Sequence, residues 1–106
     1  MTESQIQDAV RLALGRDPDV VLFRNNIGAL QNPRTGRYTR FGVGGPGGAD
    51  LIGMFRGRFL AIEVKTPTGR QTDEQRRFQD LIIARGGIYL LVRSADDAVA
   101  QIAGLR

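Results

Sequence analysis

The sequence predicts one α/β domain in which a mixed central sheet is flanked by helices. Helical patterns with clear start signals alternate with short apolar runs, in the order α-β-(hairpin)-β-β-α-β-α. Several of these runs are apolar at consecutive positions, which is typical of strands that helices cover on both faces. A chain of 106 residues can close one hydrophobic core. We therefore expect a single domain over residues 1–106.

The N-terminal half is expected to contain a helix, a strand and a hairpin. Thr2 and Gln5 fit a capping box at the start of an amphipathic helix. Residues 20–23 are an apolar, β-favouring run that predicts a buried strand. The turn signal at residues 32–36 predicts a hairpin or flap. The glycine-rich residues 42–48 are expected to be a loop inside the domain, since a linker here would leave too little chain for a second one.

The C-terminal half is expected to supply the rest of the sheet and two helices. Residues 50–55 and 59–65 predict two strands joined by a tight turn at Arg56 and Gly57. The remaining elements are a helix that begins at the capping box Thr72–Gln75 and buries Phe78, Leu81 and Ile82, a strand at residues 88–92, and a terminal helix that carries Val99 and Ile102.

Composition excludes many kinds of site. The chain has no cysteine and no histidine, so thiolate zinc sites, serine–histidine triads and histidine general bases are ruled out. An enzyme with this composition depends on carboxylates, lysine, tyrosine or a hard cation. The N-terminus has no signal-peptide pattern and no apolar run is long enough to cross a membrane. We expect a soluble, cytoplasmic protein.

The basic residues are unevenly chosen. The net charge is +4, carried by 14 arginines and a single lysine, Lys65. Excess arginine suits a polyanionic partner, although a coding bias with solvated arginines gives the same composition. An ammonium group is chemically distinct from a guanidinium, because it is compact and can contact both a phosphate oxygen and a water molecule. The retained lysine therefore marks a position of interest.

Three charged side chains are expected to meet at the open end of the second hairpin. With a two-residue turn at residues 56–57, Asp50 lies opposite Glu63, and direct cross-strand partners point to the same face. Lys65 lies two residues further and shares that face. Two neighbouring carboxylates repel each other and favour a cation between them, and Mg²⁺ is a common one beside phosphate. The alternative is a surface salt bridge at a sheet edge.

Several motifs together resemble the VRR-NUC (virus-type replication-repair nuclease) branch of the PD-(D/E)xK nuclease superfamily, over nearly the whole chain. They are a glutamate in the first helix (Glu3), a glycine-rich approach to an aspartate (residues 47–50), Glu63-Val64-Lys65 at the end of the next strand, and a helical glutamine (Gln75). The order of elements also agrees. One departure is Ala49, where the family commonly has proline before the aspartate.

The resemblance implies a restriction-endonuclease-like core and a metal-dependent deoxyribonuclease. It implies that Asp50, Glu63 and the backbone carbonyl of Val64 bind Mg²⁺ or Mn²⁺, and that Lys65 is a general base or electrostatic partner. By the same resemblance, Gln75 orients Lys65 or the water, and Glu3 contributes to a second metal position. Each of the last two residues also has a simpler interpretation: Glu3 complements the helix dipole, and Gln75 completes a capping box.

Basic residues near these acids are candidates for contact with DNA. The expected hairpin carries Arg34, Arg37, Tyr38 and Arg40, a pattern that suits phosphate contact and stacking on an exposed base. The start of the second helix is flanked by Arg70, Arg76 and Arg77, which suit a phosphate at a helix N-terminus. In both places a solvated surface is the alternative.

Stand-alone members of the family are similar to Holliday-junction resolvases that act as homodimers. The resemblance therefore implies a bacterial or phage enzyme of DNA repair that cuts four-way junctions, with two active sites related by a twofold axis. Exposed apolar residues at Ile27, Leu30 and Phe41, or on the last helix, are candidates for the dimer contact. Two alternatives remain: nicking, flap or restriction-like cleavage, and a DNA-binding module without catalysis.

Overall fold

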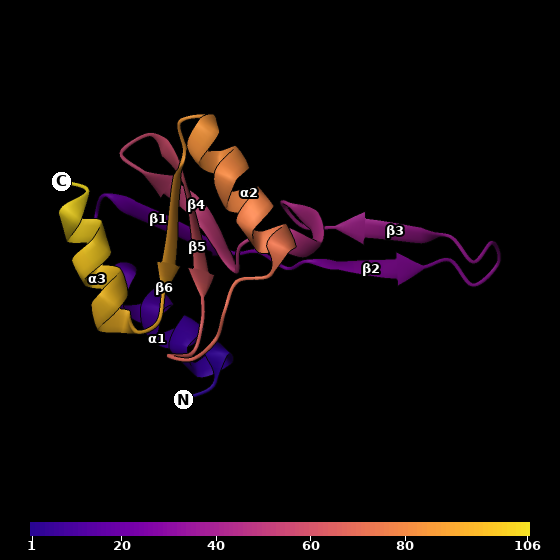
Figure 1. The fold of residues 1–106 in the computed structure, drawn as a ribbon, viewed down its shortest axis with the longest axis horizontal. Coiled ribbons are helices and arrows are strands. Elements are labelled where there is room, and N and C mark those ends of the chain that lie inside the picture. Colours follow the sequence, from indigo (N-terminus) through magenta and orange to yellow (C-terminus); the bar gives the residue numbers. More distant parts are fainter.

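The computed structural model describes residues 1–106 and has an α/β architecture with a mixed four-stranded sheet, a separate two-stranded hairpin and three α-helices (Figure 1). In chain order the elements are α1 (Glu3–Leu14), β1 (Val20–Arg24), β2 (Gly28–Gln31), β3 (Tyr38–Phe41), the 3₁₀ turn η1 (Gly45–Gly47), β4 (Leu51–Phe55), β5 (Arg58–Val64), α2 (Asp73–Ala84), β6 (Ile88–Val92) and α3 (Ala95–Gly104). No helix is long and apolar enough to pass through a lipid bilayer.

The main sheet has the strand order β1-β4-β5-β6. Strand β4 is antiparallel to both β1 and β5, whereas β6 runs parallel to β5, to which it is connected through the crossover helix α2. The β4–β5 turn has positive φ at Arg56 (49°) and Gly57 (81°). A tight hairpin turn that matches the twist of its strands requires positive φ at both central residues.

Helices α1 and α3 cover one face of the sheet. The main core lies here and includes Val10 from α1, Ile62 from β5 and Ile102 from α3. Both capping boxes predicted from the sequence are present, at Thr2 for α1 and at Thr72 for α2. Because each box satisfies free N–H groups of the first helical turn, both helix starts are fixed by local sequence.

Helix α2 covers only part of the opposite face. Its buried contact is Phe78, which packs edge-on against Tyr89 of β6 at a centroid distance of 6.2 Å. The prediction that Leu81 is buried was wrong, since half of this side chain is exposed. In α3 the buried residues are Ala98 and Ile102, whereas Val99 is exposed.

The prediction of a buried strand at residues 20–23 was correct for the strand but wrong for its burial. Strand β1 is an edge strand, and only Val20 is buried. Val21 and Phe23 lie on the α2 face of the sheet, in the part that the helix does not cover, and are 45% and 61% exposed. An apolar run alone does not reveal whether a helix lies over it.

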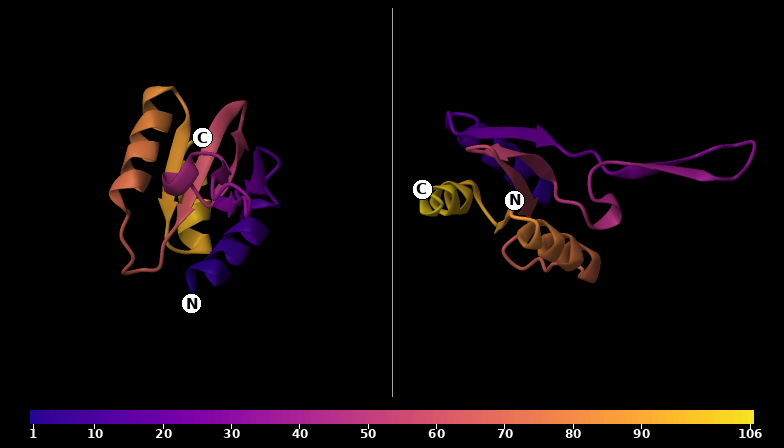
Figure 2. Two further views of the ribbon diagram at one scale, coloured as in Figure 1. Left: turned by 90° about the vertical axis from the view of Figure 1, so that its right-hand side faces the viewer. Right: turned by 90° about the horizontal axis from the view of Figure 1, so that it is seen from above.

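The β2–β3 hairpin projects away from the rest of the molecule (Figures 1 and 2). It accounts for the long axis of the 50 × 32 × 25 Å envelope. All residues of β3 and most of β2 are exposed. The hairpin predicted around residues 32–36 is therefore confirmed, as an arm joined to the sheet only at its root.

The glycine-rich segment packs against the start of α2. A methyl group added at Gly47 would lie 2.3 Å from the Glu74 carbonyl oxygen, and one at Gly48 would lie 2.1 Å from the Val43 carbonyl oxygen. Both positions therefore require glycine, because the obstructing atoms belong to the backbone. The segment is a packed loop of the same domain, as predicted.

Candidate active site

The β4–β5 hairpin brings two acids together. Its register pairs Leu51 with Ile62, as predicted. The next pair in the same register is Asp50 and Glu63, which therefore lie side by side. The Asp50 carboxylate accepts a hydrogen bond from the Val64 N–H, with an Oδ2–N distance of 2.8 Å. This contact fixes the carboxylate of Asp50 at the end of β5.

Glu63 is a buried acid with an unsatisfied oxygen. Only 2% of the residue is exposed, and its Oε2 atom has no hydrogen-bond partner. Burial raises the pKa of Glu63 to about 9, and the negative charge of Asp50 adds to this, while Lys65 opposes it. A buried polar atom without a partner is costly, so this oxygen has a strong requirement for a proton or a cation.

Lys65 is the first residue after β5. It is 8% exposed, and its backbone N–H donates to the Val92 carbonyl at 3.0 Å. All ion pairs of the structure involve Arg56 or Arg106, so the Lys65 amine is not neutralised by a carboxylate within salt-bridge range. The amine is therefore available to a ligand beside the two acids.

The carbonyl of Val64 points toward the same place. The N–H groups of Lys65 and Val64 donate to opposite sides of the strand, to Val92 on β6 and to Asp50. In a β-strand the C=O of a residue points to the same side as its N–H. The Val64 carbonyl oxygen therefore faces the Asp50 side, as a third oxygen near the acid pair.

Gln75 completes a capping box and also contacts the buried acid, while its expected action on Lys65 or the water stays a prediction. Its side-chain oxygen accepts from the Thr72 N–H at 2.9 Å, which completes the capping box of α2. Its Nε2 atom donates to Oε1 of Glu63 at 3.4 Å. One side chain thus connects the start of helix α2 to the buried acid.

Glu3 is not gathered with the other acids. It is exposed in the first turn of α1, where its charge complements the helix dipole. Its charge does contribute to the raised pKa of Glu63. No group of three acidic side chains lies within metal-binding range. The role of Glu3 at a second metal therefore stays a prediction.

The sequence did not single out Asn25, which supports Asp50. Its side chain donates to the carbonyls of Val43 (2.8 Å) and Ala49 (2.9 Å) and accepts from the Val43 N–H (3.0 Å). Its backbone N–H donates to the Asp50 carbonyl at 2.9 Å. Asn25 therefore ties both roots of the hairpin arm to the peptide groups around Asp50. The available signal was an asparagine placed directly after an apolar strand.

A second overlooked residue, Arg93, holds the loop after Lys65. Its Nη1 atom donates to the carbonyls of Thr66 (2.6 Å) and Gly69 (2.7 Å). Its backbone N–H donates to the Asp97 carboxylate at 2.9 Å. The guanidinium therefore acts as an internal brace between the end of β6 and the loop that leads to α2.

Tyr89 closes the site on the α2 side of the sheet. Burial raises the pKa of its hydroxyl to about 12, and the charges of Glu63 and Asp50 act in the same direction. Gln71 donates to the hydroxyl at 3.3 Å and opposes the shift. The phenol is therefore neutral at physiological pH and forms a wall near the acids.

The basic residues predicted to contact DNA lie at two exposed places. One set, on the hairpin arm, contains Arg34, Arg37, Tyr38 and Arg40. The other, before and within the first turns of α2, contains Arg70, Arg76 and Arg77. Arg76 also donates to the Gln71 side chain at 3.2 Å. All seven side chains are accessible to a ligand.

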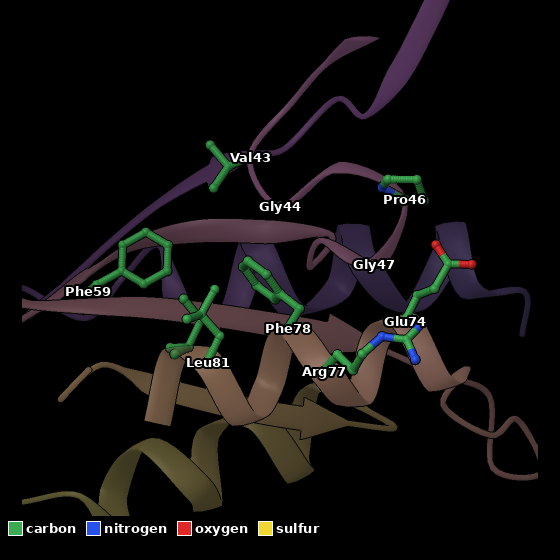
Figure 3. Close-up of a pocket in the computed structure, with 10 residues that line it drawn as sticks. Val43, Gly44, Pro46, Gly47, Phe59, Glu74, Arg77, Phe78 and Leu81 are labelled. Carbon is green, nitrogen blue, oxygen red and sulfur yellow. The ribbon is translucent and has the colours of Figure 1, made fainter. Parts of the chain in front are cut away.

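One hollow reaches the acid pair, and a larger one lies beside the glycine-rich loop. A polar cleft of about 540 Å³ has Asp50 in its wall and lies between α1 and the root of the hairpin arm. A larger apolar groove of about 670 Å³ runs between the glycine-rich loop and α2, with Phe59, Phe78 and Leu81 around it (Figure 3). None of Asp50, Glu63 or Lys65 lines the larger groove.

No protein-family model matches the chain, and no curated protein is similar to it. Asp50, Glu63 and the Val64 carbonyl offer hard oxygen donors, and a free amine lies beside them. Such a set can hold a divalent cation and act on a phosphate ester.

Proposed function

We propose that the chain is a Mg²⁺- or Mn²⁺-dependent DNA endonuclease with a restriction-endonuclease-like core of the PD-(D/E)xK type. The observation that carries the proposal is the pairing of Asp50 with the buried Glu63 at the end of one hairpin, next to the Lys65 amine. The sheet topology supports it, since a helix, three antiparallel strands, a crossover helix and a parallel strand follow the order expected from the resemblance.

The residues fit a divalent cation. Glu63 has a buried oxygen without a partner, and Asp50 places a second carboxylate beside it. Mg²⁺ is usually held by one or two carboxylates with phosphate and water, so Asp50, Glu63 and the Val64 carbonyl form a sufficient set. When bound, the cation would polarise a phosphodiester and make its water more acidic.

The other side chains have roles that follow from their positions. Gln75 holds one oxygen of Glu63 through its amide and so orients the carboxylate. The Val64 N–H does the same for Asp50. Lys65 is left to position the attacking water, take its proton, or neutralise charge that develops on the phosphate.

We also propose branched DNA, in particular a four-way junction, as the substrate, and a homodimer as the active form. Support comes from the resemblance and from the shape of the chain. An exposed basic arm extends beyond the sheet, where it can contact a second duplex arm while Asp50 and Glu63 contact the first (Figure 1). A twofold dimer would match the two equivalent strands of a junction.

A cleavage panel tests the proposal. Four-way, flap, nicked and linear duplex DNA are incubated with the protein in Mg²⁺ or Mn²⁺. We expect the wild type to cleave the four-way junction. We expect Glu63→Ala to lower the cleavage rate by more than the roughly 10- to 100-fold that is typical when an outer-sphere partner of a metal is lost. Glu74→Gln, at an exposed position of α2, is the matched control. Absence of cleavage on every substrate rejects the nuclease, and equal cleavage of linear duplex rejects junction selectivity.

A further inference from the structure

The cleft beside Asp50 contains polar side chains that the protein itself does not use. Gln7 from α1, Arg24 from the end of β1 and Asn26 from the hairpin root all line it. None of these side chains takes part in a hydrogen bond or ion pair of the structure, whereas the neighbouring Asn25 uses both ends of its amide. The cleft therefore presents one cation and two free amides next to the proposed metal site.

An aromatic ring completes this cleft. Phe41 lies opposite Gly28 in the hairpin, and a methyl group at Gly28 would lie 2.5 Å from the ring. The glycine thus leaves space for the outer carbons of the ring, while 43% of Phe41 stays exposed. The ring thus forms part of the wall of the cleft.

We propose that this cleft binds one nucleotide of the cleaved strand, next to the scissile phosphate, with its base out of the duplex stack; the inference rests on the proposed nuclease function. Each part of a nucleotide has a matching group. Arg24 suits a phosphate. The amides of Asn26 and Gln7 each offer a donor and an acceptor to a base edge, and Phe41 offers a stacking surface.

The volume agrees with such a ligand. About 540 Å³ lies within the range of roughly 300–1,000 Å³ for sites of small ligands, and it is too small for a base-paired duplex. A base must therefore leave its stack to enter. Moving a base out of the stack costs the least free energy where the base is already unpaired, as at a branch point. The cleft would make the chain selective for DNA structure without reading sequence.

Binding measurements test the cleft independently of cleavage. In a Glu63→Gln background, we compare a fluorescein-labelled duplex containing one unpaired nucleotide with the fully paired duplex by anisotropy. We expect tighter binding of the duplex with the unpaired nucleotide.

Phe41→Ala should reduce the affinity for this duplex roughly 5- to 150-fold, whereas Phe41→Tyr should keep that affinity. Asn26→Ala should remove the preference for the unpaired nucleotide. Arg24→Ala should lower the slope of log K against log salt by about 0.9, and Arg85→Ala, at the far end of α2, should change nothing.

The outcomes separate the two proposals. Equal affinity for both duplexes, or a preference that survives Phe41→Ala and Asn26→Ala, overturns the cleft even if the wild type cuts DNA. A preference that depends on these residues, in a protein that does not cut any DNA with Mg²⁺ or Mn²⁺, supports the cleft and rejects the nuclease.

Discussion

Replacing Glu63 by glutamine should stabilise the metal-free protein, and increasingly so as the pH rises. The carboxyl is buried, and its pKa is raised from the ordinary 4.5 to about 9. Between these values the folded state binds a proton that the unfolded state releases, so stability is greatest at low pH and falls as the pH rises. Glutamine has a similar shape and carries no charge at any pH, so it removes this dependence.

The size of the effect follows from the raised pKa. At pH 7 the medium lies about 2.5 pH units above the ordinary pKa of 4.5, and each unit is worth about 1.4 kcal/mol, so keeping Glu63 protonated costs about 3 kcal/mol. At pH 5 the same cost is about 1 kcal/mol. These are upper bounds, because water and side-chain rearrangement screen a charge once it forms. Against a typical total of about 5–15 kcal/mol, the gain at pH 7 is large.

Urea unfolding in EDTA at pH 5, 6, 7 and 8 measures this effect. We expect the free energy of unfolding of Glu63→Gln, relative to wild type, to increase by about 2 kcal/mol between pH 5 and 7. Glu74→Gln, on the exposed side of α2, should shift the free energy by less than about 1 kcal/mol at every pH. A difference between Glu63→Gln and wild type that stays constant with pH would refute the reasoning, whatever its sign.

Three further predictions concern the neighbours of Glu63. Lys65→Arg keeps the charge but should lose at least roughly 10-fold in cleavage rate, because a planar guanidinium cannot replace the amine beside the acids; near-normal turnover would remove Lys65 from the chemistry. Mn²⁺ at about 100 times its Kd should raise the free energy of unfolding by about 2.7 kcal/mol in wild type and not in Asp50→Asn, as thermal melts can measure; an equal gain in both would exclude Asp50 as a ligand. Gln75→Glu should keep the capping box, and hence the helix content by circular dichroism, yet slow cleavage by roughly 10- to 100-fold through the added charge beside Glu63; a matching loss of both would assign Gln75 to capping alone.

Local signals were sufficient to predict the pairing of Asp50 with Glu63. The two-residue turn at Arg56 and Gly57 sets the register, and the alternation of side chains along each strand places both acids on the same face of the sheet. The capping box around Gln75 was equally local. These parts were predictable because each depends on residues close together in the sequence.

Burial and long-range support were not predictable in the same way. Phe23 and Leu81 are exposed because α2 covers only part of its face of the sheet, and that depends on how the helix lies across the strands. Asn25 and Arg93 bind backbone carbonyls 18 to 27 residues away. A single polar residue after a strand does not indicate which distant loop it will hold.

The close packing of Gly47 has a mechanical consequence. No side chain separates this residue from the first turn of α2, because the Glu74 carbonyl occupies the space where a Cβ would lie. Backbone thus rests directly on backbone, three residues before Asp50. A tilt of the helix would therefore be transmitted to the loop that leads into Asp50, since no side chain between the two could absorb it by a rotamer change.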